Sequence, residues 1–75
     1  MISEIELYLL QKGAHKEPKR ITTNDIAAET GVSQQTASRK LIELEKGGKI
    51  ERVGAKLFLT PKAVEGMRKF VREAL

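Results

Sequence analysis

The chain has 75 residues, which suffices for one domain but leaves little room for a deep substrate cavity. Its 14 Lys and Arg residues exceed its 10 Asp and Glu residues, and the net charge of +4 favours a polyanionic partner such as nucleic acid. Cysteine is absent, which excludes disulfides, thiolate nucleophiles and cysteine-based zinc sites and fits a cytoplasmic protein.

The first predicted element is a helix that begins after Ser3, its expected N-cap, and whose end is expected to fray at Gly13. Its apolar residues recur at helical spacing, namely Ile2, Ile5, Tyr8, Leu9 and the adjacent Leu10. The apolar run at residues 7–10 is too short for a signal-peptide core or a membrane span, so we expect no membrane segment. A loop is predicted at residues 13–18, followed by a short extended segment at residues 19–22.

Two further helices are predicted on either side of a tight turn. Thr22 and Asp25 form a capping-box pattern at the start of the second helix, with Asp in place of the usual Glu. Gly31 ends this helix, because a left-handed turn residue is best supplied by glycine. Ser33 is the expected cap of a third helix, Gln34 to Lys46. Its buried stripe is predicted at Ala37, Leu41 and Leu44, with Gln35, Arg39 and Lys46 opposite.

The last third of the chain predicts a hairpin and a helix. Two short apolar runs, residues 49–53 and 56–60, flank the turn residues Gly54 and Ala55. Thr60 as N-cap and Pro61 in the first helical position start a helix that runs towards Leu75. Its buried stripe is predicted at Val64, Met67, Val71 and Leu75, with Phe70 and Ala74 at the margin.

This order of elements is typical of a winged helix-turn-helix, a mainly helical α+β fold with a three-helix core, a β-hairpin wing and a C-terminal helix. Small Ala27, the turn at Gly31 and apolar Val32 and Ala37 suit a close helix crossing. A plain helical hairpin shares the glycine turn, but it has no need of an outward helix rich in Gln, Ser, Thr and Arg beside a basic hairpin. Residues 1–75 are therefore expected to form a single DNA-binding domain.

The segment from Val32 to Glu45 resembles the recognition helix of winged-helix transcription regulators, with a capping Ser, a Thr, a Ser-Arg pair and then leucines. Within that group, the stretch 33–39 and the start of the last helix at 59–62 are similar to the N-terminal winged-helix domain of archaeal CTP-dependent riboflavin kinases. The resemblance spans essentially the whole chain, although the kinase barrel is absent. It implies an archaeal or bacterial transcription regulator, or alternatively a regulatory or protein-interaction module attached to such an enzyme.

The solvent side of the third helix carries the side chains that are predicted to read bases, which are Gln34, Gln35, Ser38 and Arg39. Gln can pair with adenine N6 and N7, and Arg can fork onto guanine O6 and N7 in the major groove. Predicted backbone contacts are Thr23, Ser33, Thr36, Arg52 and Lys56, of which the Ser33 and Thr36 contacts are implied by the resemblance. Ser33 alternatively serves only as a cap, and the two wing cations as solvated edge charges.

Other conspicuous residues are not expected to carry chemistry. His15 stands alone in a loop and is expected to be solvated, and Gly47-Gly48 lacks the Lys-Ser/Thr sequel of a phosphate loop. Glu43, Glu45 and Glu51 are expected to form solvated ion pairs. No nucleophile–base set is present, so we expect neither enzymatic activity nor a metal or cofactor.

Two features leave the choice of partner open. Ile42 falls on the outward face of the third helix, where it can meet a thymine methyl group, another domain or nothing. Winged helices commonly pair through their first and last helices, so a homodimer is expected. The predicted surface for pairing consists of Tyr8, Phe70 and the margin of the Val64-Met67-Val71 stripe.

Overall fold

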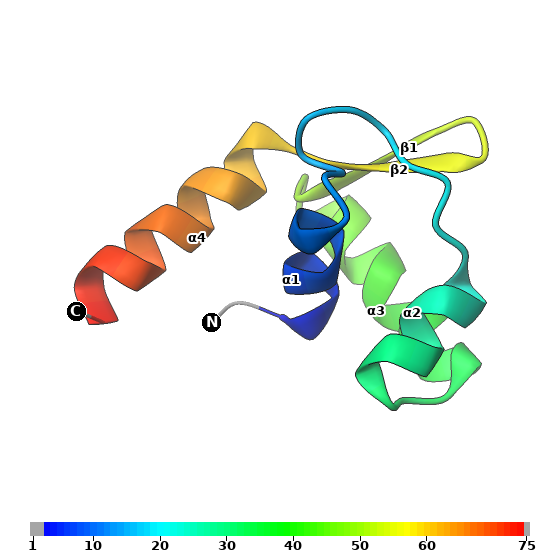
Figure 1. Cartoon of the computed structure of the whole chain (residues 1–75). Coiled ribbons are helices and arrows are strands. Elements are labelled where there is room, and N and C mark those ends of the chain that lie inside the picture. Colours follow the sequence, from blue (N-terminus) through cyan, green and yellow to red (C-terminus); the bar gives the residue numbers. More distant parts are fainter. Residues whose placement is uncertain (1–2, 75) are drawn as a thin grey trace.

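Four helices and a two-stranded antiparallel hairpin make up the computed structural model, which describes residues 3–74 apart from the side chains of 70, 71, 73 and 74. The elements in chain order are α1 (Glu4–Gln11), α2 (Thr23–Thr30), α3 (Gln34–Lys46), β1 (Ile50–Val53), β2 (Lys56–Leu59) and α4 (Pro61–Ala74) (Figure 1). The predicted winged-helix architecture is confirmed. The predictions for Ile2, Phe70, Val71, Ala74 and Leu75 concern side chains outside the described residues.

The hairpin pairs in the register Ile50 with Leu59 and Val53 with Lys56, so a two-residue turn joins its strands. Gly54 takes the left-handed conformation that this turn requires, with φ of 64°. The extended segment at 19–22 adds a third partner, because Lys19 and Leu57 exchange backbone hydrogen bonds of 2.9 and 2.8 Å. The hairpin is thereby attached to the loop that leads into α2.

The core lies where the first three helices meet the inner face of the hairpin. Ile26, Leu41 and Leu59 are fully buried there, on α2, α3 and β2 respectively. The remaining buried hydrophobic residues are Ile5, Leu9, Ala14, Ile21, Ala37, Ile50, Leu57, Ala63 and Met67. Since these residues come from every element, the exposed face of α3 is held by a core that spans the chain.

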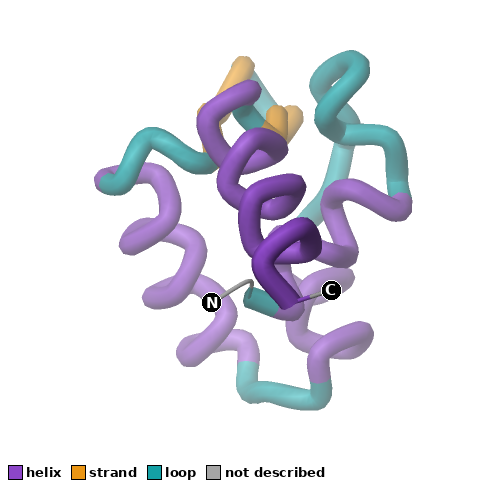
Figure 2. Tube along the Cα trace, turned by 90° about the vertical axis from the view of Figure 1, so that its left-hand side faces the viewer, coloured by secondary structure: helices purple, strands orange, loops and turns teal. Residues whose placement is uncertain are grey.

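The last helix leaves the hairpin on the side opposite to the hairpin turn (Figure 1). Figure 2 looks onto α4, which stands in front of the other helices with the hairpin at its upper end. Thr60 caps it through a 3.4 Å bond from the Ala63 N–H, and its hydroxyl also donates to the Gly48 carbonyl at 2.7 Å. Ala63 and Met67 are buried, whereas Val64 is only half-buried, so the buried stripe lies slightly to one side of the prediction.

Candidate nucleic-acid interface

Local hydrogen bonds define both ends of α2. Thr22 Oγ1 accepts the Asp25 N–H at 3.1 Å, and the Asp25 carboxylate accepts the Thr22 N–H at 3.0 Å, which completes the predicted capping box. Gly31 ends α2 with φ of 73°, and its N–H donates to the Ala27 carbonyl. The left-handed conformation of Gly31 therefore ends α2 at the turn that leads into α3.

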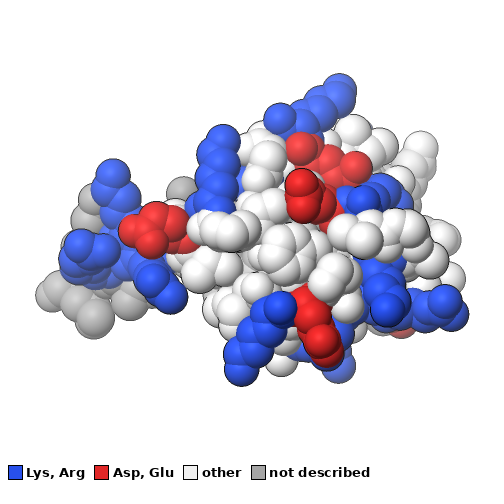
Figure 3. Space-filling view, turned by 90° about the horizontal axis from the view of Figure 1, so that it is seen from above, with Lys and Arg blue, Asp and Glu red and all other residues white. Residues whose placement is uncertain are grey.

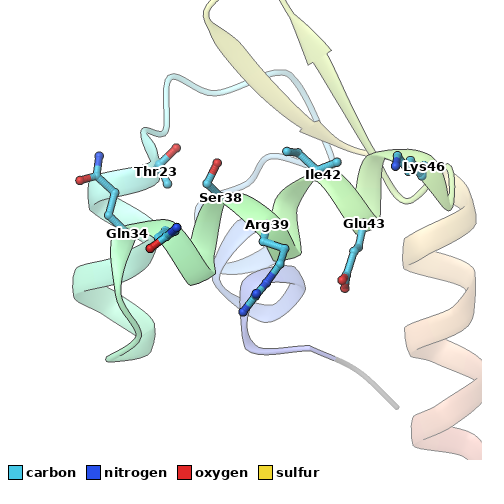
Figure 4. Close-up of a pocket in the computed structure, with 8 residues that line it drawn as sticks. Thr23, Gln34, Ser38, Arg39, Ile42, Glu43 and Lys46 are labelled. Carbon is cyan, nitrogen blue, oxygen red and sulfur yellow. The ribbon is translucent and has the colours of Figure 1, made fainter.

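The exposed side of α3 carries all four residues that were predicted to contact bases. Gln34, Gln35 and Arg39 are exposed and Ser38 is half-buried, while Ala37 and Leu41 on the other side are 0% and 1% exposed. A shallow depression of about 720 Å³ runs along this face (Figure 4). Its lining consists of Thr23, Gln34, Gln35, Ser38, Arg39, Ile42, Glu43 and Lys46.

Three of these lining residues were not assigned a DNA contact from the sequence: Glu43, Lys46, which was only placed opposite the buried stripe, and Ile42, whose outward position was predicted but whose partner was left open. Their positions follow from helical spacing, because Ile42 lies one turn beyond Ser38 and Glu43 one turn beyond Arg39. The sequence prediction stopped after two turns of α3, whereas the depression continues to its last turn. Thr23, at the start of α2, closes the other end, so two helices contribute to one surface.

Ser33 and Thr36 are engaged with each other at the start of α3. Ser33 Oγ accepts the Thr36 N–H at 3.1 Å and donates to Thr36 Oγ1 at 2.9 Å. The capping role of Ser33 is thus present in the structure. Neither residue lines the depression, and their contact with phosphate stays a prediction.

The two wing cations differ in their surroundings. Arg52 on β1 donates from Nε to Glu45 Oε1 at 2.6 Å, which joins the hairpin to the last turn of α3. Lys56, at the start of β2, is exposed and has no ion-pair partner among the side chains that the structure describes. Seen from above, Lys and Arg side chains gather over α4 and at the end where the hairpin turn lies, with acidic side chains between them (Figure 3).

The carboxylate of Asp25 lies close to the start of α2. The backbone N–H of Thr22, followed by the Thr22 hydroxyl, holds the pKa of Asp25 below its ordinary value of 3.8. Asp25 is therefore ionised at neutral pH and stays bound within its own cap. Because this negative charge lies near Thr23, it weakens the attraction of a phosphate to this helix end.

A family model described as winged helix-turn-helix DNA-binding matches residues 7–51, which include most of α1, all of α2 and α3, and the beginning of β1. The chain belongs to this DNA-binding family. No curated protein matches the chain, and no solved structure matches it. The family assignment names DNA as the partner, and the depression on α3 is the exposed face of the helix that follows its helix-turn-helix turn.

Besides the depression on α3, the winged helix domain has a second concave surface, at α4. This groove of about 590 Å³ is lined by Leu10, His15, Val64, Met67, Arg68 and Arg72. His15 was expected to be solvated, and this is wrong, because the residue is half-buried and its Nδ1 is buried without a hydrogen-bond partner in the described part of the chain. Tyr8 lies elsewhere, in a separate depression with Lys12.

The expected acidic ion pairs of the winged helix domain form in part. Glu45 pairs with Arg52, but Glu43 and Glu51 are exposed and have no ion pair among the described residues. Among the described side chains, no cluster of three or more His, Asp or Glu residues is placed to hold a metal ion. In the part of the chain that the structure describes, no helix combines the length and apolar character needed to cross a bilayer.

Proposed function

We propose that this winged helix domain is a transcription regulator that binds double-stranded DNA sequence-specifically, with α3 in the major groove and the hairpin on the backbone or in the minor groove. One observation carries the proposal. Gln34, Gln35, Ser38 and Arg39 line a single exposed depression while the apolar side of α3 is buried. An α-helix fits the major groove, where each base pair presents its own pattern of donors and acceptors.

The proposed contacts follow from residue type and position. Gln34, Gln35, Ser38 and Arg39 bond base edges. Thr23, Ser33, Thr36, Arg52 and Lys56 are assigned to the phosphate backbone, which fixes the register of α3 without reading sequence. Lys56 is the stronger wing contact, since Glu45 already neutralises part of the Arg52 charge. Residues 1–75 act together as one DNA-binding domain.

The test is selection of bound duplexes from a random pool, followed by titration of Arg39→Ala against the preferred duplex and a scrambled one. The variant is expected to lose selectivity while its circular dichroism spectrum is unchanged, because Arg39 is exposed and makes no ion pair in the described residues. Each good bidentate pair supplies about 1–3 kcal/mol of discrimination. Lys69→Ala, at an exposed position that lines neither the depression on α3 nor the groove at α4, is the control. Undiminished selectivity in Arg39→Ala would refute the assigned recognition role.

We also propose that two copies pair through α1 and α4 and so bind an inverted repeat. The support is the groove at Leu10, Val64 and Met67, an apolar surface away from the α3 depression. Sedimentation equilibrium compares Val64→Lys with Val53→Lys, a substitution at an exposed apolar position of the hairpin outside this groove. Only Val64→Lys is expected to yield monomers. Dimers that persist in this variant would place the interface elsewhere.

A second candidate is a regulatory or protein-interaction module attached to an enzyme such as an archaeal riboflavin kinase. The same groove at α4 favours this candidate, because a following domain of the same polypeptide can cover an apolar surface there. A mobility-shift titration at low salt distinguishes the two. A shifted duplex supports the regulator, whereas no shift combined with capture of the purified kinase domain supports the attached module.

A further inference from the structure

Ile42 is an exposed aliphatic side chain within a polar surface. It is 46% exposed and is the one purely apolar residue among the eight that line the α3 depression. The preceding Leu41 is 1% exposed. Because successive residues of a helix are about 100° apart around its axis, Leu41 packs in the core while Ile42 faces outwards. Figure 4 shows Ile42 projecting from α3 on the same side as Ser38, one turn further along.

The major groove contains one apolar feature that distinguishes a base, the C5 methyl group of thymine. We infer that Ile42 contacts a thymine methyl and is a specificity-determining residue, an assignment that rests on the proposed DNA-reading function of α3. Ile42 follows Arg39 by three residues, a rise of about 4.5 Å, and base pairs are stacked about 3.4 Å apart. The thymine therefore lies one or two base pairs from the base that Arg39 reads.

The surroundings of Ile42 favour DNA over a protein partner. The core of a protein–protein interface is apolar and depleted of charge. Around Ile42 the depression is instead lined by Arg39, Glu43 and Lys46, and no second aliphatic side chain joins it there. A groove of base edges with isolated methyl groups matches such a surface, because a single apolar contact sits among polar ones.

The experiment replaces each thymine of the preferred duplex, one at a time, by deoxyuridine, which lacks only the methyl group. Burial of one methyl contributes about 0.8 kcal/mol, so one such replacement is expected to weaken binding by the wild-type chain about fourfold. In Ile42→Ala the same replacement is expected to have no effect, which is the coupling expected of two groups in contact. Leu7→Ala, at an exposed large hydrophobic position of α1 outside the proposed DNA contacts, is the matched control and keeps the fourfold loss.

The outcomes separate this inference from the function on which it rests. Duplex binding without any uracil-sensitive position overturns the inference alone. A uracil penalty that persists in Ile42→Ala, or that disappears in Leu7→Ala, assigns the methyl to another residue and also overturns it. If the wild-type chain binds no duplex, the proposed function and the inference fail together.

Discussion

Glu45 Oε1 lies 2.6 Å from Arg52 Nε, so an ion pair joins the last turn of α3 to the first strand of the hairpin. The two side chains are 28% and 50% exposed, and they connect the proposed groove-reading helix with the proposed wing. A side-chain contact therefore links these two elements, in addition to the short connection at residues 47–49.

This ion pair is expected to add little stability. Unfolding by urea of Glu45→Gln, Arg52→Ala and the double variant should give a coupling energy of about 0.2–1 kcal/mol, because exposed pairs are weak. The coupling should shrink at about 1 M salt, where charges are screened within about 3 Å. Coupling that is absent, or that does not change with salt, would contradict a stabilising ion pair at this position.

The wing cations are expected to differ in the salt dependence of DNA binding. Lys56→Ala should reduce the slope of log K against log salt by about 0.9, the value for one lost phosphate contact. Arg52→Ala should reduce it by less, since Glu45 already partly neutralises the guanidinium. Fluorescence anisotropy over a range of salt concentrations measures both slopes, with Lys69→Ala on α4 as the control. Equal slopes for Lys56→Ala and wild type would exclude Lys56 from the phosphate contacts.

Truncation of two adjacent residues of α3, Leu41 and Ile42, is expected to have very different effects on the free energy of unfolding. Leu41→Ala should lower the free energy of unfolding by about 2–5 kcal/mol, because it leaves a cavity in a core where Leu41 is 1% exposed. Ile42→Ala should change it by less than about 0.5 kcal/mol, as is usual for exposed positions. Chemical denaturation monitored by circular dichroism measures both. A large loss in Ile42→Ala would mean that Ile42 packs inside the domain.

The capping box of α2 predicts a specific acid sensitivity. The pKa of Asp25 is lowered on folding, chiefly by the backbone N–H of Thr22, so its contribution to stability is present above its ordinary value of 3.8 and is lost as pH falls through the lowered folded value. Asp25→Asn should therefore lower the melting temperature at neutral pH and by less at acid pH below 3.8.

Thermal unfolding over this pH range checks the effect, with Glu29→Gln on the same helix as the control because Glu29 takes no part in the cap. A difference between Asp25→Asn and wild type that stays constant with pH would show that ionisation of Asp25 is not responsible.

The local structure could be predicted because its causes lie within a few residues. The Thr22–Asp25 box, the Ser33 cap, the turn at Gly31 and the bounds of α3 depend on hydrogen bonds and apolar spacing over three or four positions. The exposed side of α3 followed from the same period, since the positions of Ala37 and Leu41 fix where Arg39 points.

Contacts between segments that are distant in sequence were decided by the tertiary structure alone. The pairing of Glu45 with Arg52, the bridge from Lys19 to Leu57 and the burial of His15 Nδ1 appear only once the chain is folded. The extension of the depression to Ile42 likewise depends on how far the core covers α3. The physical reason is that a repeat of apolar residues fixes which side of a helix is buried, while the neighbours of each side chain depend on how the elements pack against one another.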